Sequence, residues 1–108
     1  MSTVSIILPY YKKREFIKET LNSIINQSYK DFEVIIIYDD ESVEDLDFIK
    51  NIIVNDDRIK LIVNNKNLGV GPSRNIGINN SIGSYLAFID GDDLWDKDKL
   101  IKQISFMK

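Results

Sequence analysis

Short apolar runs alternate along the 108-residue chain with longer segments whose apolar residues recur every three or four positions. The short runs are typical of buried strands, and the longer segments are typical of amphipathic helices. The predicted strands are Val4–Leu8, Phe32–Tyr38, Ile59–Val63 and Tyr85–Ile89. This alternation, with short connections, predicts an α/β fold: a mainly parallel sheet of about four strands with helices on both faces.

Four helices are expected, one after each strand. The first helix runs from about Glu15 to Asn26. Its apolar residues, which are expected to pack on the sheet, are Phe16, Ile17, Leu21, Ile24 and Ile25. Ser42, three places before Asp45, resembles a capping box and predicts the start of a helix that buries Leu46, Ile49 and Ile53. The third helix carries Ser73, Arg74, Asn75 and Gly77, and the last carries Leu100, Ile101 and Ile104. Pro9 is predicted to end the first strand.

An acidic cluster follows the last predicted strand directly. It contains Asp90, Asp92 and Asp93, with Gly91 between the first two. In open α/β sheets, ligands bind outside the carboxyl ends of the strands. Because Gly91 permits backbone angles that other residues resist, two carboxylates can face one point and hold a hard cation, Mn²⁺ or Mg²⁺. A solvated turn in which Asp93 caps the next helix is an equal alternative for this stretch alone.

The loops after the first and second strands share the same rim of the predicted sheet. The loop after the first strand carries Tyr10, Tyr11, Lys12 and Lys13, and the loop after the second carries Asp39 and Asp40. A carboxylate can accept a hydrogen bond from a nucleotide base, aromatic rings can flank the base, and a cation can meet a diphosphate. The alternatives are loop packing for the tyrosines, a solvated turn for the cations and a plain strand end for the aspartates.

The segment Asn67–Ile78 combines glycines with a predicted helix start. Gly69 and Gly71 permit a tight bend, and Pro72 suits a first helical turn. Arg74, predicted in that first turn, opposes the helix dipole at a cost of about 0.3–1 kcal/mol, so an anionic partner would explain it. A salt bridge to a nearby acidic loop is the competing interpretation.

Composition narrows the chemistry further. The chain has no cysteine and no histidine, so oxygen atoms must hold any metal, and proton transfer falls to carboxylates. A net charge of −3 without a basic run disfavours nucleic-acid binding, and it makes a bridging cation necessary for binding phosphates. No stretch has the apolar length of a transmembrane segment, and the first residues lack the features of a secretory signal. We therefore expect a cytoplasmic protein.

Five motifs occur in order and together cover essentially the whole chain. They are V-S-I-I-L-P-Y-Y, L-N-S-I-I-N-Q-S-Y, F-E-V-I-I-I-Y-D-D-E-S, N-L-G-V-G-P-S-R-N-I-G and Y-L-A-F-I-D-G-D-D-L-W. This set resembles the amino-terminal half of a family 2 inverting glycosyltransferase. The resemblance implies a Rossmann-like GT-A fold and metal-dependent binding of a nucleotide-sugar, with a UDP-sugar as the expected donor and Mn²⁺ or Mg²⁺ as the cofactor.

The resemblance also implies roles on the nucleotide side. Asp40 matches the second acid of the family's D-D-G-S motif and would bind the base, with Asp39 beside it. Pro9 and Tyr11 would line the base pocket. Two residues depart from the pattern, because Glu41 replaces the glycine of D-D-G-S and Lys12 replaces the asparagine that follows Pro-x-Tyr.

On the diphosphate side, Asp90 and Asp92 match the family's D-x-D motif and are the implied metal site. Asp90 would also lie toward the ribose, and Asp92 would hold the cation on the diphosphate. Arg74 matches the arginine of the A-R-N-x-G segment and would lie near the diphosphate.

Enzymes of this family have a further half that binds the acceptor and supplies a general base for direct displacement at the anomeric carbon. No residue here matches that base, so we predict no catalytic residue. Residues 1–108 are expected to be the donor-binding half, truncated before the acceptor half and inactive alone. The acceptor would be a glycan or a lipid-linked acceptor in polysaccharide biosynthesis. A peripheral position at the inner face of the cell membrane is the alternative to a freely cytoplasmic one. A noncatalytic nucleotide-sugar-binding or interaction module is the main alternative.

Overall fold

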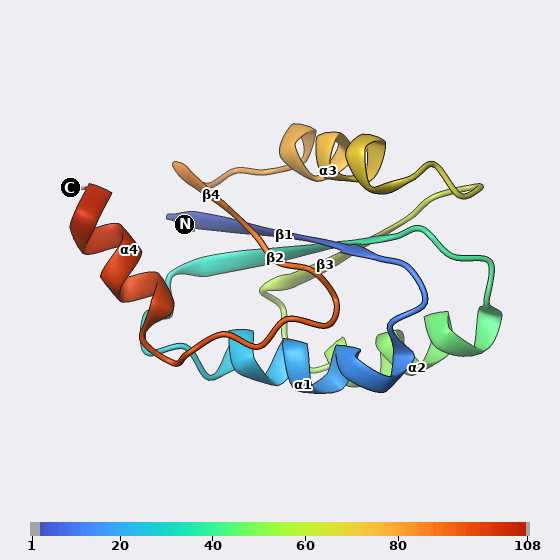
Figure 1. Ribbon diagram of the computed structural model, residues 1–108, viewed down its shortest axis with the longest axis horizontal. Coiled ribbons are helices and arrows are strands. Elements are labelled where there is room, and N and C mark those ends of the chain that lie inside the picture. The colour runs from blue at the N-terminus through green and yellow to red at the C-terminus, as the bar shows by residue number, and fades with distance from the viewer. Residues whose placement is uncertain (1–2, 108) are drawn as a thin grey trace.

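The computed structural model describes residues 3–107. Strands and helices alternate strictly within this range, as Figure 1 shows. In chain order they are β1 (Val4–Tyr10), α1 (Arg14–Ile25), β2 (Phe32–Tyr38), α2 (Val43–Ile53), β3 (Ile59–Val63), α3 (Val70–Asn79), β4 (Tyr85–Phe88) and α4 (Lys99–Met107). The predicted α/β alternation is confirmed.

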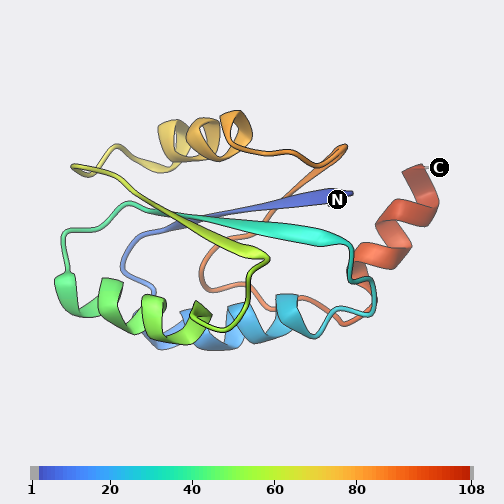
Figure 2. The same ribbon diagram turned by 180° about the vertical axis from the view of Figure 1, so that it is seen from behind.

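The four strands form one parallel sheet in the order β3-β2-β1-β4. Helices α1 and α2 lie on one face and α3 lies on the other, as both views show (Figures 1 and 2). Because β1, β2 and β4 are parallel, the loops at their carboxyl ends meet at one rim. The predicted sheet with helices on both faces is therefore confirmed.

Strand alternation divides the core into two layers. In β1 the even-numbered residues from Val4 to Tyr10 belong to the larger cluster, which also contains buried residues of α1, α2 and α4. Ile7 and Ile37 belong to the smaller cluster, under Ile76 of α3. Helix α3 lies so close to the sheet that a Cβ on Gly77 would meet Ile7 Cγ2 at 2.5 Å. Glycine at this position sets how closely α3 packs.

Strand β1 does not end at Pro9, contrary to the prediction. It continues to Tyr10, and Pro9 pairs with Ile37 of β2. Ile7 accepts a hydrogen bond from Ile89 N on the β4 side, so Pro9, two residues later, directs its nitrogen to that side as well. The pairing with β4 stops at Ile7, so the missing N–H of Pro9 interrupts no ladder bond there.

Strand β4 is not the buried strand that was predicted. It ends at Phe88, and Leu86 and Phe88 are 40% and 45% exposed. The strand lies at the edge of the sheet, and α3 covers β1 and β2 instead. Two residues predicted to face the core, Phe16 and Ile101, are also exposed, because they lie beside rather than on the buried stripes of their helices.

The predicted capping box is half present. Ser42 caps α2, and its Oγ accepts a hydrogen bond from Asp45 N at 3.1 Å. The reciprocal bond is absent from the described residues, since Ser42 N donates to Asp40 Oδ1 instead. The Asp45 carboxylate accepts a bond from Tyr10 OH at 2.8 Å, so it ties α2 to the end of β1.

Candidate functional site

A cavity of about 650 Å³ lies at the carboxyl ends of β1, β2 and β4, and we call it the rim cavity. Four segments line it: the loop after β1, the end of β2, the start of α3 and the turn after β4. Its lining residues are Pro9, Tyr10, Tyr11, Lys12, Lys13, Asp39, Asn67, Gly69, Val70, Asp90, Gly91 and Asp92. The parallel sheet therefore brings together most of the residues singled out in the sequence.

The turn Asp90–Asp93, which we call the acidic turn, presents three exposed carboxylates. Each offers one oxygen, and these oxygens all lie within 4.8 Å of one another. The turn is closed by hydrogen bonds from Asp93 N to Asp90 O at 3.0 Å and from Asp90 N to Asp93 Oδ2 at 3.2 Å. The three aspartates of the predicted acidic cluster therefore lie together, whereas the expected metal ligands were Asp90 and Asp92.

Gly91 is needed for a reason other than the predicted one. Gly91 does not have a positive φ, because among the described glycines a positive φ occurs at Gly69 alone. A Cβ at Gly91 would instead lie 2.9 Å from Lys13 Cγ. The Gly91 carbonyl accepts a hydrogen bond from Thr20 Oγ1 of α1 at 2.9 Å. The acidic turn is thus docked on α1 and its N-terminal loop.

Two cations pair with the acidic turn. Lys13 Nζ lies 3.1 Å from Asp92 Oδ2, and an Arg74 guanidinium nitrogen lies 3.5 Å from Asp90 Oδ1. The salt bridge considered for Arg74 is therefore present, and Arg74 is the fifth residue of α3 rather than part of its first turn. All four side chains are 37–55% exposed, so each pair is worth about 0–1 kcal/mol and is readily exchanged for a ligand.

Asp39 is buried, with 3% of its surface exposed, and its carboxylate is hydrogen-bonded within the protein. It accepts hydrogen bonds from Leu68 N at 2.7 Å, Gly69 N at 2.9 Å and Asn64 Nδ2 at 2.9 Å. Burial raises the pKa of Asp39, but these three donors outweigh burial and hold the pKa below its usual value. Asp39 therefore fixes the loop between β3 and α3, which forms one wall of the rim cavity.

Asp40 is more accessible and lies on the other side of the loop after β1. Its carboxylate accepts from Lys12 N at 2.9 Å and from Ser42 N at 3.1 Å. It lines a smaller neighbouring cavity of about 420 Å³, and Lys12 lines both cavities. Lys12 has a φ of 53°. Asparagine tolerates this left-handed region better than lysine does, which explains the asparagine expected at this place from the family pattern.

The two tyrosines after β1 have different surroundings. Tyr10 is buried, stacks on Tyr38 with ring centroids 5.1 Å apart and donates to Asp45. Burial raises the pKa of Tyr10 and raises that of Tyr38 to about 12, so both stay protonated. Tyr11 is 47% exposed on the cavity wall beside Pro9. Tyr11 is thus the ring available to a ligand, while Tyr10 belongs to the core.

Three residues at the site, Asn64, Asn67 and Thr20, were not predicted as site residues from the sequence. Asn67 lines the rim cavity and donates to Asp39 O at 3.1 Å, and Asn64 bonds the Asp39 carboxylate. A cluster of amides directly after a strand was a usable signal for both. Thr20 is a buried polar residue on the otherwise apolar stripe of α1. A polar residue at such a position was the signal that its side chain has a hydrogen-bond partner.

Comparison with protein-family models matches residues 5–108 to the family described as "Glycosyl transferase family 2". The chain belongs to this family. The resemblance and the GT-A fold inferred from the motifs are therefore confirmed.

Two relatives described as glycosyltransferases align along nearly the whole chain. It is 38% identical over 104 residues to a Bacillus subtilis protein described as "Putative teichuronic acid biosynthesis glycosyltransferase TuaG". It is 36% identical over 104 residues to the Escherichia coli "UDP-Glc:alpha-D-GlcNAc-diphosphoundecaprenol beta-1,3-glucosyltransferase WfgD". Each alignment covers 96% of this chain but only 41% and 40% of those relatives, so the chain spans less than half their length.

A solved structure supports the same assignment. The crystal structure of S. aureus TarS 1-349 in complex with UDP-GlcNAc superposes with a TM-score of 0.87 and 29% identity, covering 99% of this chain and 31% of that one. Among the described residues, no helix has the length and apolar character needed to cross a membrane.

Proposed function

We propose that the rim cavity binds the nucleoside diphosphate of a nucleotide-sugar, with a UDP-sugar as the donor. The observation that carries this proposal is the acidic turn, whose carboxylate oxygens converge within 4.8 Å at the wall of a cavity that also contains Lys13. WfgD is named for a UDP-glucose donor, and TarS was solved with UDP-GlcNAc, which supports uracil as the base.

Asp90 and Asp92 would hold a divalent cation, Mn²⁺ or Mg²⁺. The donor set fits such an ion, because it consists of exposed carboxylate oxygens without nitrogen or sulfur ligands. With a net charge of −3 and three carboxylates at the turn, the site would repel a bare diphosphate. The cation would neutralise charge on the departing nucleoside diphosphate. Asp90 would also approach the ribose, and Arg74, next to Asp90, would approach the diphosphate.

The base would lie against Tyr11 and Pro9. Tyr11 presents an exposed ring on the cavity wall. Each oxygen of Asp40 accepts one bond from a backbone N–H and keeps a second acceptor site, so the carboxylate can accept the base imino N–H. Asp39 would contribute through the loop that it fixes rather than through a direct bond.

The reaction would be an inverting transfer to an acceptor hydroxyl. Such a transfer needs a general base, and within residues 3–107 the carboxylates that line the rim cavity are Asp39, Asp90 and Asp92. Asp39 is buried and accepts three hydrogen bonds within the protein, and the other two are assigned to the cation. We infer that the base and the acceptor surface come from outside the described residues. This chain would then be the donor-binding part of the enzyme and would not transfer sugar alone.

The names of the relatives favour an enzyme over a noncatalytic binding module. WfgD is described as acting on a diphosphoundecaprenol-linked sugar, and TuaG is assigned to teichuronic acid biosynthesis. A lipid-linked or polysaccharide acceptor is therefore proposed for the whole protein, at the cytoplasmic face of the membrane.

The test is calorimetric titration of the purified chain with UDP, with Mn²⁺ present or with EDTA. Binding is expected only with the metal, and Asp92→Asn should weaken it strongly. The matched control is Asp57→Asn, the same change at an exposed residue before β3. Equal binding in EDTA would remove the metal from the proposal, and no binding in either condition would refute the donor site.

A further inference from the structure

Lys13 contacts the acidic turn at both ends of its side chain. Its stem packs on Gly91, where a Cβ would lie 3.0 Å from Lys13 Cβ and 2.9 Å from Lys13 Cγ. Its Nζ lies 3.1 Å from Asp92 Oδ2. The absence of a side chain at Gly91 therefore lets Lys13 approach the turn. The Lys13 ammonium forms an ion pair with Asp92, one of the two carboxylates assigned to the cation.

The neighbouring cations have other partners. Lys12 lies over the ring of Tyr11, with its Nζ 5.2 Å from the centroid. Arg14 pairs with Asp45 at 3.4 Å and lies over Phe48, 4.6 Å from the ring centroid. Of these three consecutive cations, Lys13 is the one that reaches the acidic turn in the described structure.

We propose that Lys13 is an exchangeable counter-ion of the acidic turn and a ligand of the diphosphate. Without a metal, its ammonium neutralises Asp92. When a divalent cation takes Asp92, the ammonium is displaced and binds the diphosphate that the same cation attracts. The proposal rests on the proposed nucleotide-sugar site, and it assigns Lys13 a role in coupling metal binding to nucleotide binding.

The structure makes this exchange physically reasonable. Lys13 and Asp92 both line the rim cavity, so the displaced ammonium stays within the space proposed for the diphosphate. Their side chains are 37% and 40% exposed, so the pair is weak and solvated. The lysine side chain is flexible, and its ammonium is a compact charge with three hydrogen-bond donors. The ammonium can therefore change partners while Cβ and Cγ of Lys13 stay packed on Gly91.

Exchange predicts opposite effects on the two ligands. Removal of the ammonium frees Asp92 and removes a repelling charge, so Mn²⁺ alone should bind about two- to fivefold more tightly, as expected for an exposed ion pair. Removal of a charge-assisted bond to the diphosphate should weaken UDP binding about tenfold at saturating Mn²⁺. A lysine that merely supports the turn would change both affinities in the same direction.

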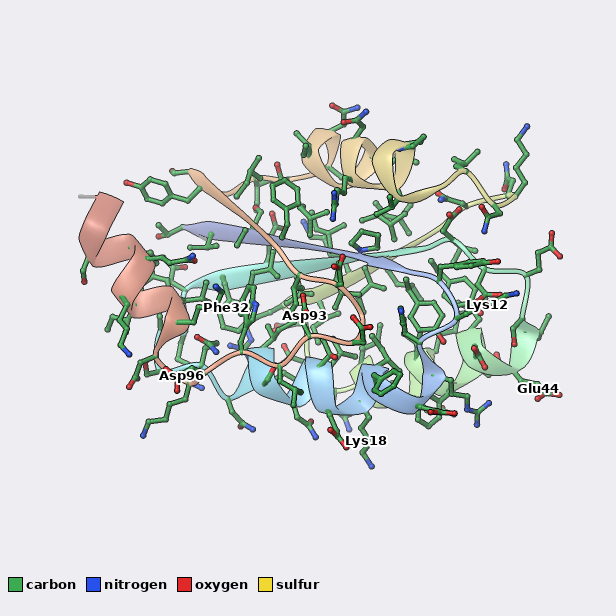
Figure 3. The ribbon with its side chains drawn as sticks, viewed as in Figure 1. Lys12, Lys18, Phe32, Glu44, Asp93 and Asp96 are labelled. Atoms are coloured by element: carbon green, nitrogen blue, oxygen red, sulfur yellow. The ribbon has the colours of Figure 1, made fainter. Side chains whose placement is uncertain are left out.

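The experiment compares the wild type with Lys13→Met, which keeps a long apolar side chain against Gly91. Free Mn²⁺ is measured by electron paramagnetic resonance without nucleotide, and UDP binding is measured by calorimetry at saturating Mn²⁺. Lys18→Met is the matched control, because Lys18 is exposed on α1 and points away from the sheet in Figure 3. Lys13→Gln serves as a second neutral variant, with the same two opposite shifts expected.

Tighter Mn²⁺ binding together with weaker UDP binding, absent in Lys18→Met, would support the exchange. Unchanged affinities, or two shifts of the same sign, in variants whose circular dichroism matches the wild type would overturn it while leaving the donor site in place. A wild-type chain that binds no UDP with Mn²⁺ would instead refute the proposed function, and the role of Lys13 with it.

Discussion

Loss of the Asp39 carboxylate is expected to release the loop between β3 and α3. In Asp39→Ala, Leu68 N and Gly69 N lose the oxygens that they contact at 2.7 and 2.9 Å. A hydrogen bond to a charged group contributes about 1.5–3 kcal/mol, and because both bonds are only part-buried, we expect their loss together to cost about 2–6 kcal/mol. A domain of this size is stable by only about 5–15 kcal/mol, so the effect should be large.

Urea denaturation followed by circular dichroism measures this loss. With a slope of about 2 kcal/mol per molar urea, the midpoint should fall by about 1–3 M. Asp57→Ala, the same change at an exposed residue, should leave the midpoint nearly unchanged. If Asp39→Ala and Asp57→Ala unfold at the same urea concentration, Asp39 does not anchor the loop and our account of its hydrogen bonds is wrong.

The same carboxylate gives a pH signature. Burial raises the pKa of Asp39, but its hydrogen bonds outweigh burial and lower the pKa in the folded chain. A carboxyl group with a lowered folded pKa stabilises the fold above its unfolded pKa of about 3.9, and this stabilisation is lost as the pH falls through the folded pKa. Wild type and Asp39→Asn should therefore differ most near neutral pH and converge in acid. A stability difference that stays constant down to pH 2 would contradict this.

Three further outcomes are expected. Asp40→Ala should weaken UDP binding about 10- to 150-fold, the equivalent of one charge-assisted bond, and an unchanged calorimetric dissociation constant in a folded variant would make Asp40 structural. Gly77→Ala should destabilise the chain by about 1–3 kcal/mol in urea, because its Cβ would lie 2.5 Å from Ile7 Cγ2 and 2.9 Å from Ile37 Cδ1; a neutral effect would mean that α3 shifts freely. Long incubation of the chain with Mn²⁺, nucleotide-sugars and acceptors should yield no glycoside by chromatography, and robust transfer would show that these residues contain a base.

The sequence predicted the sheet well because local composition determines its strands. Apolar runs such as Phe32–Tyr38 are bounded by polar residues, and β2 is buried along its whole length. Errors arose where neighbours decide the outcome. Pro9 stays in β1 because β4 has already ended beside it, and Leu86 and Phe88 are exposed because α3 covers other strands. Neither fact is present in the local pattern.

The location of the rim cavity was predicted to a similar extent. Placing acids at the carboxyl ends of parallel strands was enough to locate the acidic turn and the loop after β2 at one rim. The different environments of Asp39 and Asp40 were not predictable, because the donors to Asp39 come from residues 64–69, far along the chain. The contact between Lys13 and Asp92 joins positions 79 residues apart, so it could not be predicted from the local sequence either.

The acidic turn follows β4 in the sequence, yet α1 and its N-cap residue Lys13 also position it. Strand β4 has four residues and lies at the sheet edge with half of its side chains exposed, so its hold on the turn comes mainly through buried Ile89, whose N–H donates to Ile7 O at 3.1 Å. Thr20 bonds the Gly91 carbonyl, and the stem and ammonium of Lys13 contact Gly91 and Asp92. The geometry available to a cation therefore depends on how α1 packs against the sheet. It follows that changes on the buried stripe of α1 should disturb metal binding more than changes to the exposed side chains of β4, although β4 is next to the acids in the chain.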